Sequence, residues 1–166
     1  MGEKIENAVN SAALLISGFC FSGMIMSIAV NVICRYFFNL SFDWAEEIAY
    51  LFFNWAVFLG ATVIFRNQEM VAIDIVVNRL PQGARRAAMI INYALILAIT
   101  LALVVWGFRF AMNAWIRKST ALGISYFFYD MSIPLSSLIL AGYALKYLVM
   151  TLKGEEIKQV PVEERL

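Results

Sequence analysis

The sequence predicts an all-α integral membrane protein with four transmembrane helices, and two observations lead to this fold class. Hydrophobic residues make up 62% of the 166-residue chain and charged residues 15%, whereas a soluble domain is about half apolar and a quarter charged. The apolar residues also gather into four long runs, each close to the ~20 residues that a helix needs to cross a bilayer. The predicted spans are residues 8–34, 44–65, 87–112 and 133–152.

The first two spans have clear boundary signals. The first ends at Arg35, which is followed by three aromatic residues, 36–38, and aromatic residues beside a charge are typical of a membrane interface. Asp43, with Glu46 three places later, resembles a capping box that would start the second helix. Arg66 directly follows the second apolar run. Both spans are therefore expected to end at the membrane surface.

The third and fourth spans are bounded in a similar way. Two arginines, 85 and 86, precede the third span. Ser132 is expected to cap the fourth helix, Pro134 is tolerated in its first turn, and Gly154 is expected to end it. The spans, their connections and a polar C-terminal tail at 155–166 are predicted to form a single membrane domain over residues 1–166.

Two connections contain more than turns. Apolar residues between 69 and 80 recur at helical spacing with polar residues on the other faces. Twelve residues are too few to cross a membrane, so the pattern predicts a short amphipathic helix lying in the interface. In residues 119–130, four successive aromatics at 126–129 predict a loop at the depth of the lipid headgroups.

The distribution of lysine and arginine predicts that both termini are cytoplasmic. With that topology nine of these residues lie inside and four outside, which agrees with the positive-inside rule. The inside set comprises Lys4, Arg66, Arg79, Arg85, Arg86, Lys146, Lys153, Lys158 and Arg165, and the outside set comprises Arg35, Arg109, Arg117 and Lys118.

Composition also argues against several classes of function. The chain has no histidine, which excludes histidine-ligated haem, histidine-containing metal sites and histidine general bases. No cofactor and no bound metal are predicted. The net charge of +1 gives no basic patch for nucleic acid. Sequence motifs of hydrolases, metalloproteases and phosphate-binding loops are absent, so an enzyme is not expected.

Small and weakly polar residues form a stripe along one face of the first span. They are spaced three or four apart and comprise Ser17, Cys20, Met24, Ser27, Asn31 and Cys34. Such a stripe could line a polar pathway, or it could pack against another helix. Because it carries no charge at mid-membrane, helix packing is the favoured interpretation.

A group of charges is expected near one membrane surface: Arg35, Asp43, Glu46, Glu47 and Arg109. The glutamates could bind a proton or a cation, or the group could form ion pairs that join helix ends or dock a partner. Coupling sites usually lie near the midplane on broken helices. None of the four spans carries an internal proline, so the structural role is favoured, with Arg35 and Arg109 placed to pair with the glutamates.

Several segments resemble one family. Residues 42–61, with a tryptophan, two adjacent acidic residues, an aromatic run and then Leu-Gly-Ala, are similar to the small membrane subunit of tripartite ATP-independent periplasmic (TRAP) transporters. Residues 66–74 and 119–124, and the Ile-Pro-Leu at 133–135, also resemble that family. The resemblance covers nearly the whole chain.

This resemblance implies a bacterial inner-membrane protein that works with partners. A large multi-span permease subunit would hold the substrate and sodium sites and move them as an elevator. A periplasmic substrate-binding protein would deliver a carboxylate such as a C4-dicarboxylate or sialic acid. The small subunit would enlarge the static scaffold within the membrane lipid. Residues expected to face the partner or anchor the chain are Trp44, Glu46, Glu47, Asn54, Arg66 and Asp74.

Two other classes remain open at this stage. One is a membrane assembly protein unrelated to transport. The other is a small self-sufficient exporter, but such four-helix exporters rely on a membrane-embedded glutamate in their first helix. No acidic residue occurs between positions 8 and 34 of this chain.

Overall fold

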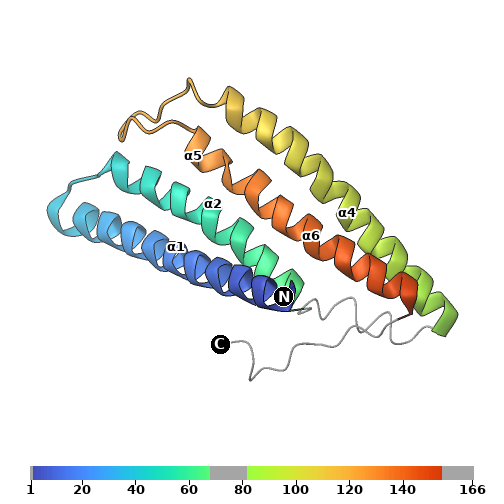
Figure 1. Ribbon diagram of the computed structural model, residues 1–166. Helices are drawn as coiled ribbons and strands as arrows, with labels where there is room; N and C mark the ends of the chain where they lie inside the picture. Colours follow the sequence, from blue (N-terminus) through green and yellow to red (C-terminus); the bar gives the residue numbers. More distant parts are fainter. Residues whose placement is uncertain (1, 68–81, 155–166) are drawn as a thin grey trace.

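A computed structural model describes residues 2–67 and 82–154, and all of its principal elements are helices (Figure 1). The helices are α1 (Gly2–Phe38), α2 (Asp43–Arg66), α4 (Gln82–Asn113), α5 (Phe127–Asp130) and α6 (Ser132–Lys153). The amphipathic helix predicted at 69–80 and the tail at 155–166 lie outside the described residues.

Four segments are long and apolar enough to cross a membrane, and they confirm the predicted all-α fold with four spans. They are Glu6–Phe38, Asp43–Arg66, Gly83–Asn113 and Phe127–Lys153, between 24 and 33 residues in length. Helices α1 and α4 continue beyond the spans predicted at 8–34 and 87–112. Their extra turns are consistent with tilted helices or with ends that leave the hydrocarbon layer.

The long helices lie side by side in one row, in the order α1, α2, α6, α4 (Figure 1). Helix α1 contacts α2, α2 contacts α6, and α6 contacts α4, but within the described chain α1 and α4 do not meet. Helices α2 and α6 run in the same direction, and the two outer helices run opposite to them. The chain therefore forms a flat, open layer rather than a closed four-helix bundle.

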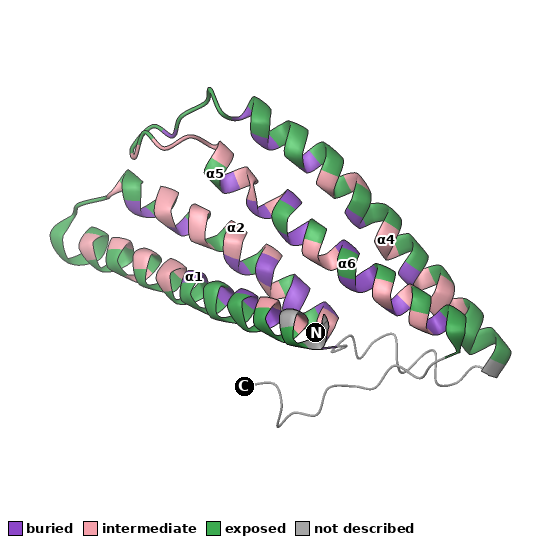
Figure 2. Cartoon of the chain, in the orientation of Figure 1, coloured by how far each residue is buried: buried purple, intermediate pink, exposed green. Residues whose placement is uncertain are grey.

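Burial follows this arrangement (Figure 2). Both central helices bury small side chains, which are Ala45, Ala49 and Ala56 on α2 and Ala141 and Ala144 on α6. Small residues allow helix backbones to approach closely in lipid. The outer helices instead expose many large apolar side chains, so both edges of the row have surfaces suited to lipid or to a partner.

An aromatic cluster joins three of the helices where α2 and α6 end. Phe65 of α2 packs against Tyr93 of α4 and Tyr147 of α6, with ring centroids 6.4 and 5.8 Å apart. Tyr93 and Tyr147 complete the triangle at 5.7 Å. All three side chains are buried, so this cluster is the main core of the layer.

The helix ends differ in part from the expected caps. Phe42, and not Asp43, is the N-cap of α2, and no side chain caps that helix. The capping-box prediction is wrong because Asp43 already lies in the first turn. Ser132 is also not a cap, since its hydroxyl donates to the Tyr129 carbonyl at 2.9 Å. Gly154 does end α6 as predicted, with a left-handed backbone φ of 80°.

The aromatic connection is more ordered than the predicted loop. Four of its residues form the short helix α5, Phe127–Asp130, which leads almost directly into α6. Before α5, Lys118 and Ser125 pair as an isolated antiparallel bridge. The residues between them therefore form a compact turn, not an extended strap.

Candidate functional site

Polar contacts between helices gather at the two ends of the row. We call one the loop end, where α1 ends, α2 begins and residues 114–126 connect α4 to α5. The other is the terminal end, where α1 and α4 begin and α2 and α6 end (Figure 1). The candidate site residues divide between these two ends.

Glu47 is the principal polar link at the loop end. Its carboxylate accepts hydrogen bonds from the Thr120 hydroxyl at 3.1 Å, the Ala121 amide at 2.9 Å and the Leu122 amide at 2.8 Å. Hydrogen bonds to an ionised carboxylate are stronger than neutral ones. One side chain in the first turns of α2 therefore fixes a turn more than seventy positions away in the chain.

The turn that binds Glu47 is shaped by its own backbone. The Ser119 amide donates to the Ile124 carbonyl at 2.8 Å, and the Gly123 amide donates to the Ser119 carbonyl at 3.1 Å. Gly123 has a φ of 68°, a conformation that glycine adopts without steric cost. This geometry turns two consecutive amides, of Ala121 and Leu122, toward the carboxylate.

Aromatic residues strengthen the same link. The Trp55 indole nitrogen donates to the Phe128 carbonyl at 3.0 Å, and the Tyr50 ring stacks on Tyr129 at 5.8 Å. Both contacts join α2 to α5. The loop end is thus held by the α2 face that carries Glu47, Tyr50 and Trp55.

The polar stripe of α1 serves packing, as predicted. The Ser27 hydroxyl donates to the Ala45 carbonyl at 2.7 Å. The Asn31 side-chain oxygen accepts from the Phe42 amide at 3.1 Å, and its amide group lies 3.4 Å from Glu46. Because Ser17 and Cys20 are also buried, the stripe is the surface on which α1 meets α2.

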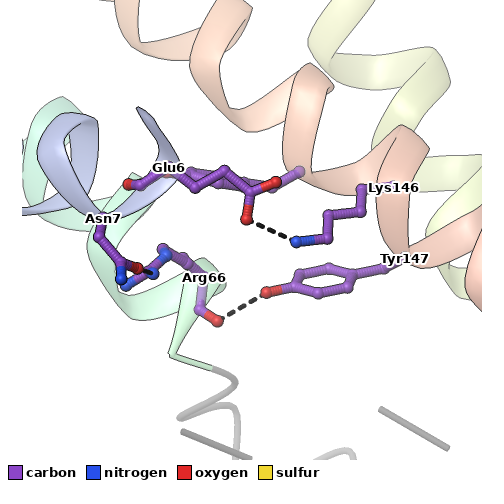
Figure 3. Close-up of polar contacts among 6 residues, drawn as sticks. Glu6, Asn7, Arg66, Lys146 and Tyr147 are labelled. Atoms are coloured by element: carbon purple, nitrogen blue, oxygen red, sulfur yellow. Dashed lines mark hydrogen bonds and ion pairs between the residues drawn. The ribbon is translucent and has the colours of Figure 1, made fainter. Parts of the chain in front are cut away.

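The terminal end has a second polar cluster (Figure 3). Lys146 of α6 forms an ion pair with Glu6 of α1 at 2.5 Å, and Arg66 donates to the side-chain oxygen of Asn7. The Tyr147 hydroxyl donates to the Arg66 carbonyl at 2.7 Å. The start of α1 is therefore tied to the ends of both central helices.

Arg86 links the remaining helix to this end. Its guanidinium donates to the carbonyls of Thr151 and Leu152, at 3.2 and 2.6 Å. These carbonyls belong to the last turn of α6, where helix carbonyls lack the usual intrahelical partners, and the Thr151 carbonyl also accepts from the Gly154 amide at 3.2 Å. A cation at that position also interacts favourably with the helix dipole.

The predicted site residues are therefore not brought together as one site. Trp44, Glu46 and Glu47 lie at the loop end, where Trp44 and Glu46 are exposed and Glu47 is half-buried. Asn54 is half-buried within α2, Arg66 is at the terminal end, and Asp74 lies outside the described residues.

The expected ion pairs at the loop end are not found among the described residues. Arg35 and Asp43 lie exposed near the α1–α2 turn, and Arg109 is exposed on α4. Within residues 2–67 and 82–154, Glu6 and Lys146 form the one ion pair. Glu47 instead binds backbone amides and a hydroxyl, which satisfy the carboxylate without a cation.

Sequence reasoning missed the residues that bind the predicted ones. The Glu47 partners at Thr120–Leu122 lie in a connection that was singled out for its aromatic residues and its family resemblance, but not for binding Glu47. Gly123 directly after them is a turn signal that could have predicted a tight, amide-presenting loop. Glu6, Lys146 and Tyr147 have no local signal, because their contact depends on which helices are neighbours. In the described part of the chain, no three Cys, Asp or Glu side chains are grouped to hold a metal ion.

Comparison with known proteins assigns these features to a family. The family model of the DctQ component of tripartite ATP-independent periplasmic transporters matches residues 24–154. A TRAP transporter small permease protein of Haemophilus influenzae is 31% identical over 81 residues, which cover 49% of this chain and 50% of the relative. The C4-dicarboxylate TRAP transporter small permease protein DctQ of Vibrio cholerae is 24% identical over 107 residues, covering 64% of this chain and 46% of the relative.

A third relative is a much longer protein. The sialic acid TRAP transporter permease protein SiaT of Haemophilus influenzae is 24% identical over 132 residues, which are 80% of this chain but 21% of SiaT. The matches to the first two relatives span about half of their length. The family model covers all four long helices in whole or in part, and its members are transporter components rather than enzymes. The chain therefore belongs to the DctQ family of TRAP transporter small permease subunits.

Proposed function

We propose that this chain is the small permease subunit of a sodium-driven TRAP transporter for organic-acid uptake. In this role it does not carry substrate. It acts as a static scaffold for a large multi-span permease, which moves the substrate as an elevator, and a periplasmic binding protein supplies that substrate.

The observation that carries this proposal is the flat, open row of helices. A pathway across a membrane has to be enclosed, and a single layer of four helices encloses none on its own. Large apolar side chains stay exposed on both outer helices, including Leu15 (73%) and Phe19 (70%) on α1 and Ile99 (58%) on α4. Such a layer can extend the membrane-embedded surface of a second, larger protein.

The links at both ends support a rigid scaffold rather than a moving part. At the loop end, Glu47 joins α2 to the α4–α5 connection, and at the terminal end Arg66, Lys146 and Arg86 join the starts and ends of all four long helices. A static element needs such cross-links because it has to resist the motion of its partner. We assign Glu47 and Arg66 to this anchoring role.

Of the exposed candidates, Trp44 is assigned to the partner and Glu46 to anchoring the chain. Trp44 and Glu46 keep much of their surface free at the loop end, and aromatic residues are frequent at the core of protein interfaces. Asn54 and Asp74 complete the proposed set of partner-facing or anchoring residues.

The long relative supports a stable association. A segment similar to this chain is about a fifth of SiaT, so in that protein the segment is covalently part of a permease. We propose that here the same association is made by separate chains. The names of the relatives include both C4-dicarboxylate and sialic acid, so the proposed substrate is a small organic acid of one of these classes.

We also propose that the protein is a multi-pass protein of the bacterial inner membrane with both termini in the cytoplasm. The terminal end carries six of the described basic residues: Lys4, Arg66, Arg85, Arg86, Lys146 and Lys153. The loop end and its flanking turns carry four, accompanied by Asp43, Glu46, Glu47 and Asp130. This asymmetry favours a cytoplasmic terminal end.

The test is to purify the tagged chain from its native membrane in mild detergent and identify the proteins recovered with it. Photo-cross-linkers at Leu15 on α1 and Leu95 on α4 would then report which edge meets the partner. Ala144, which is fully buried between helices, is the matched control position and should give no intermolecular product.

An equimolar multi-span permease, cross-linked from one edge but not from position 144, is the expected result. Recovery of the chain alone, or as a homodimer, would contradict the scaffold role. In that case the exposed Glu46 would be tested next as a coupling site.

A further inference from the structure

Two cavities open along the same side of the α1–α2 pair. One has a volume of about 300 Å³ and an apolar lining that includes Gly18, Phe21, Phe53 and Val57. The other, about 150 Å³, lies near the α1–α2 turn and is lined by both charged and apolar side chains, including Ile28, Asn31, Arg35 and Glu46. We call them the apolar cavity and the polar cavity.

The two cavities follow one another along one face of α1, and we call this face with its two cavities the groove. Phe21 lines the apolar cavity, and Ile28 and Arg35 line the polar one. These residues are seven positions apart, which is two turns of helix, so they stand on one face of α1. Phe21, Ile28 and Val57 are about half exposed (54%, 47% and 48%), so both cavities are accessible from outside the helix pair.

The distance between the two cavities is close to the thickness of one leaflet's hydrocarbon layer. From Asn31 in the polar cavity to Phe21 in the apolar cavity is ten residues, or about 15 Å of helix at a rise of ~1.5 Å per residue. The hydrocarbon core is about 30 Å thick, and half of it is about 15 Å. A molecule with its polar part beside Asn31 would thus reach the apolar cavity with one acyl chain.

The polar cavity carries opposite charges that do not neutralise each other. Arg35 and Glu46 both line it, yet they form no ion pair with each other, nor does either have one elsewhere among the residues described. The Glu46 carboxylate accepts a hydrogen bond from the Asn31 side-chain amide at 3.4 Å. A cation and an anion held apart in one small cavity are complementary to a zwitterion.

We propose that this groove binds one phospholipid with a zwitterionic, primary-ammonium headgroup of the phosphatidylethanolamine class. Arg35 binds the phosphate, Glu46 accepts hydrogen bonds from the ammonium group, and one acyl chain fills the apolar cavity. The inference concerns a ligand of this chain itself and does not depend on the proposed role as a scaffold.

The test measures lipid retention by native mass spectrometry of the delipidated full chain. Phosphatidylethanolamine, phosphatidylcholine and phosphatidylglycerol with identical acyl chains are supplied one at a time. Phosphatidylcholine has the same phosphate but no N–H donor, and phosphatidylglycerol has no ammonium. We expect one tightly retained phosphatidylethanolamine, favoured about tenfold over the other two, as for one charge-assisted hydrogen bond.

Three variants separate the parts of the site. Glu46→Gln should remove the preference for phosphatidylethanolamine, and Arg35→Gln should weaken retention of all three lipids about tenfold. Gly18→Leu should weaken retention without altering the headgroup preference. A Cβ added at position 18 meets nothing within 4 Å, and Gly18 lines the apolar cavity, so we expect the leucine side chain to enter that cavity and to leave helix packing intact.

Two matched variants serve as controls. Arg85→Gln removes an exposed arginine at the opposite end, and Gly142→Leu adds a side chain where α6 also has open space. Both should retain lipid like the unmodified chain. Equal retention of all three lipids by every variant would overturn the proposal, because it indicates only a non-specific lipid shell.

Evidence that a helix of a partner protein occupies the groove would also overturn the lipid-binding proposal. In that case Gly18→Leu and Arg35→Gln would lower recovery of a co-purifying permease while lipid retention stayed the same. Because lipid retention and permease recovery are separate readouts, failure of this inference is distinguishable from failure of the proposed function.

Discussion

Replacing Tyr147 by phenylalanine tests whether the polar cluster at the terminal end stabilises the layer. The hydroxyl of this buried tyrosine donates to the Arg66 carbonyl at 2.7 Å. Phenylalanine keeps the ring that packs against Phe65 and Tyr93, so the substitution removes the hydrogen bond to Arg66 and retains these ring contacts. It leaves one carbonyl at the end of α2 without this donor.

The expected loss is about 1 kcal/mol in the free energy of unfolding. A hydrogen bond contributes about 0.5–1.5 kcal/mol net in proteins, and bonds between membrane helices average about 0.6 kcal/mol with a maximum near 1.7 kcal/mol. The short distance and the buried ring place this bond in the upper part of that range. A loss of about 1 kcal/mol raises the unfolding equilibrium constant about fivefold.

The neighbouring Tyr143 provides a matched control. It lies on the same helix and is equally buried, but its hydroxyl is 3.5 Å from the Glu6 carbonyl, at the limit of a hydrogen bond. Tyr143→Phe should therefore change the free energy of unfolding by no more than about 0.3 kcal/mol. Equilibrium unfolding of each variant in mixed micelles, followed by circular dichroism, measures both values. Equal losses for the two variants, or none for Tyr147→Phe, would refute the reasoning.

Three further substitutions have distinct expected results. Glu47→Gln should speed hydrogen exchange at the two loop amides that bind the carboxylate while exchange in α6 stays unchanged; uniform acceleration would contradict a local role. Gly107→Leu should lower the free energy of unfolding by about 1–3 kcal/mol, because a Cβ there lies 3.1 Å from the Ile133 side chain of α6. Gly142→Leu should be tolerated, since a Cβ at that position meets nothing within 4 Å. Equal stability of the two variants would disprove the close approach at Gly107. Arg86→Gln should increase exchange only in the last turn of α6, whose carbonyls it caps; unchanged exchange there would show that the cap is dispensable.

The fold class could be predicted because each membrane span is recognisable from the hydropathy of its own residues, without knowledge of the other helices. Residues 44–65 are apolar with charges at both ends, and that is enough to define a span. The stripe on α1 was also interpretable, since spacings of three and four place Ser27 and Asn31 on one face whatever helix lies opposite. Local patterns thus predicted the elements and one packing surface.

The predictions that were wrong, for the cap of α2 and for the partners of Glu47, depended on geometry that a local sequence pattern does not contain. Asp43 has the spacing of a capping residue, but the extended backbone of Phe42 places the helix start one residue earlier. Glu47 was expected to pair with a distant arginine. The donors that reach the Glu47 carboxylate come from the turn at Ser119–Ile124. No local sequence pattern indicates that this turn lies next to the start of α2. Contacts between such distant segments follow from helix order, which hydropathy does not encode.

The order of the helices in the layer also sets the order in which the layer can be completed during synthesis. Helices α1 and α2 are neighbours in sequence and in space, so they can associate as a hairpin as soon as both are inserted. Helix α4 follows but has no contact with α1 and reaches α2 chiefly across α6. Among the described helices, α6 is therefore the last to be made and the one that joins α4 to the α1–α2 pair, and a chain truncated before Ser132 would leave α4 without this neighbour. The continuity of the layer thus depends on the 22 residues of α6.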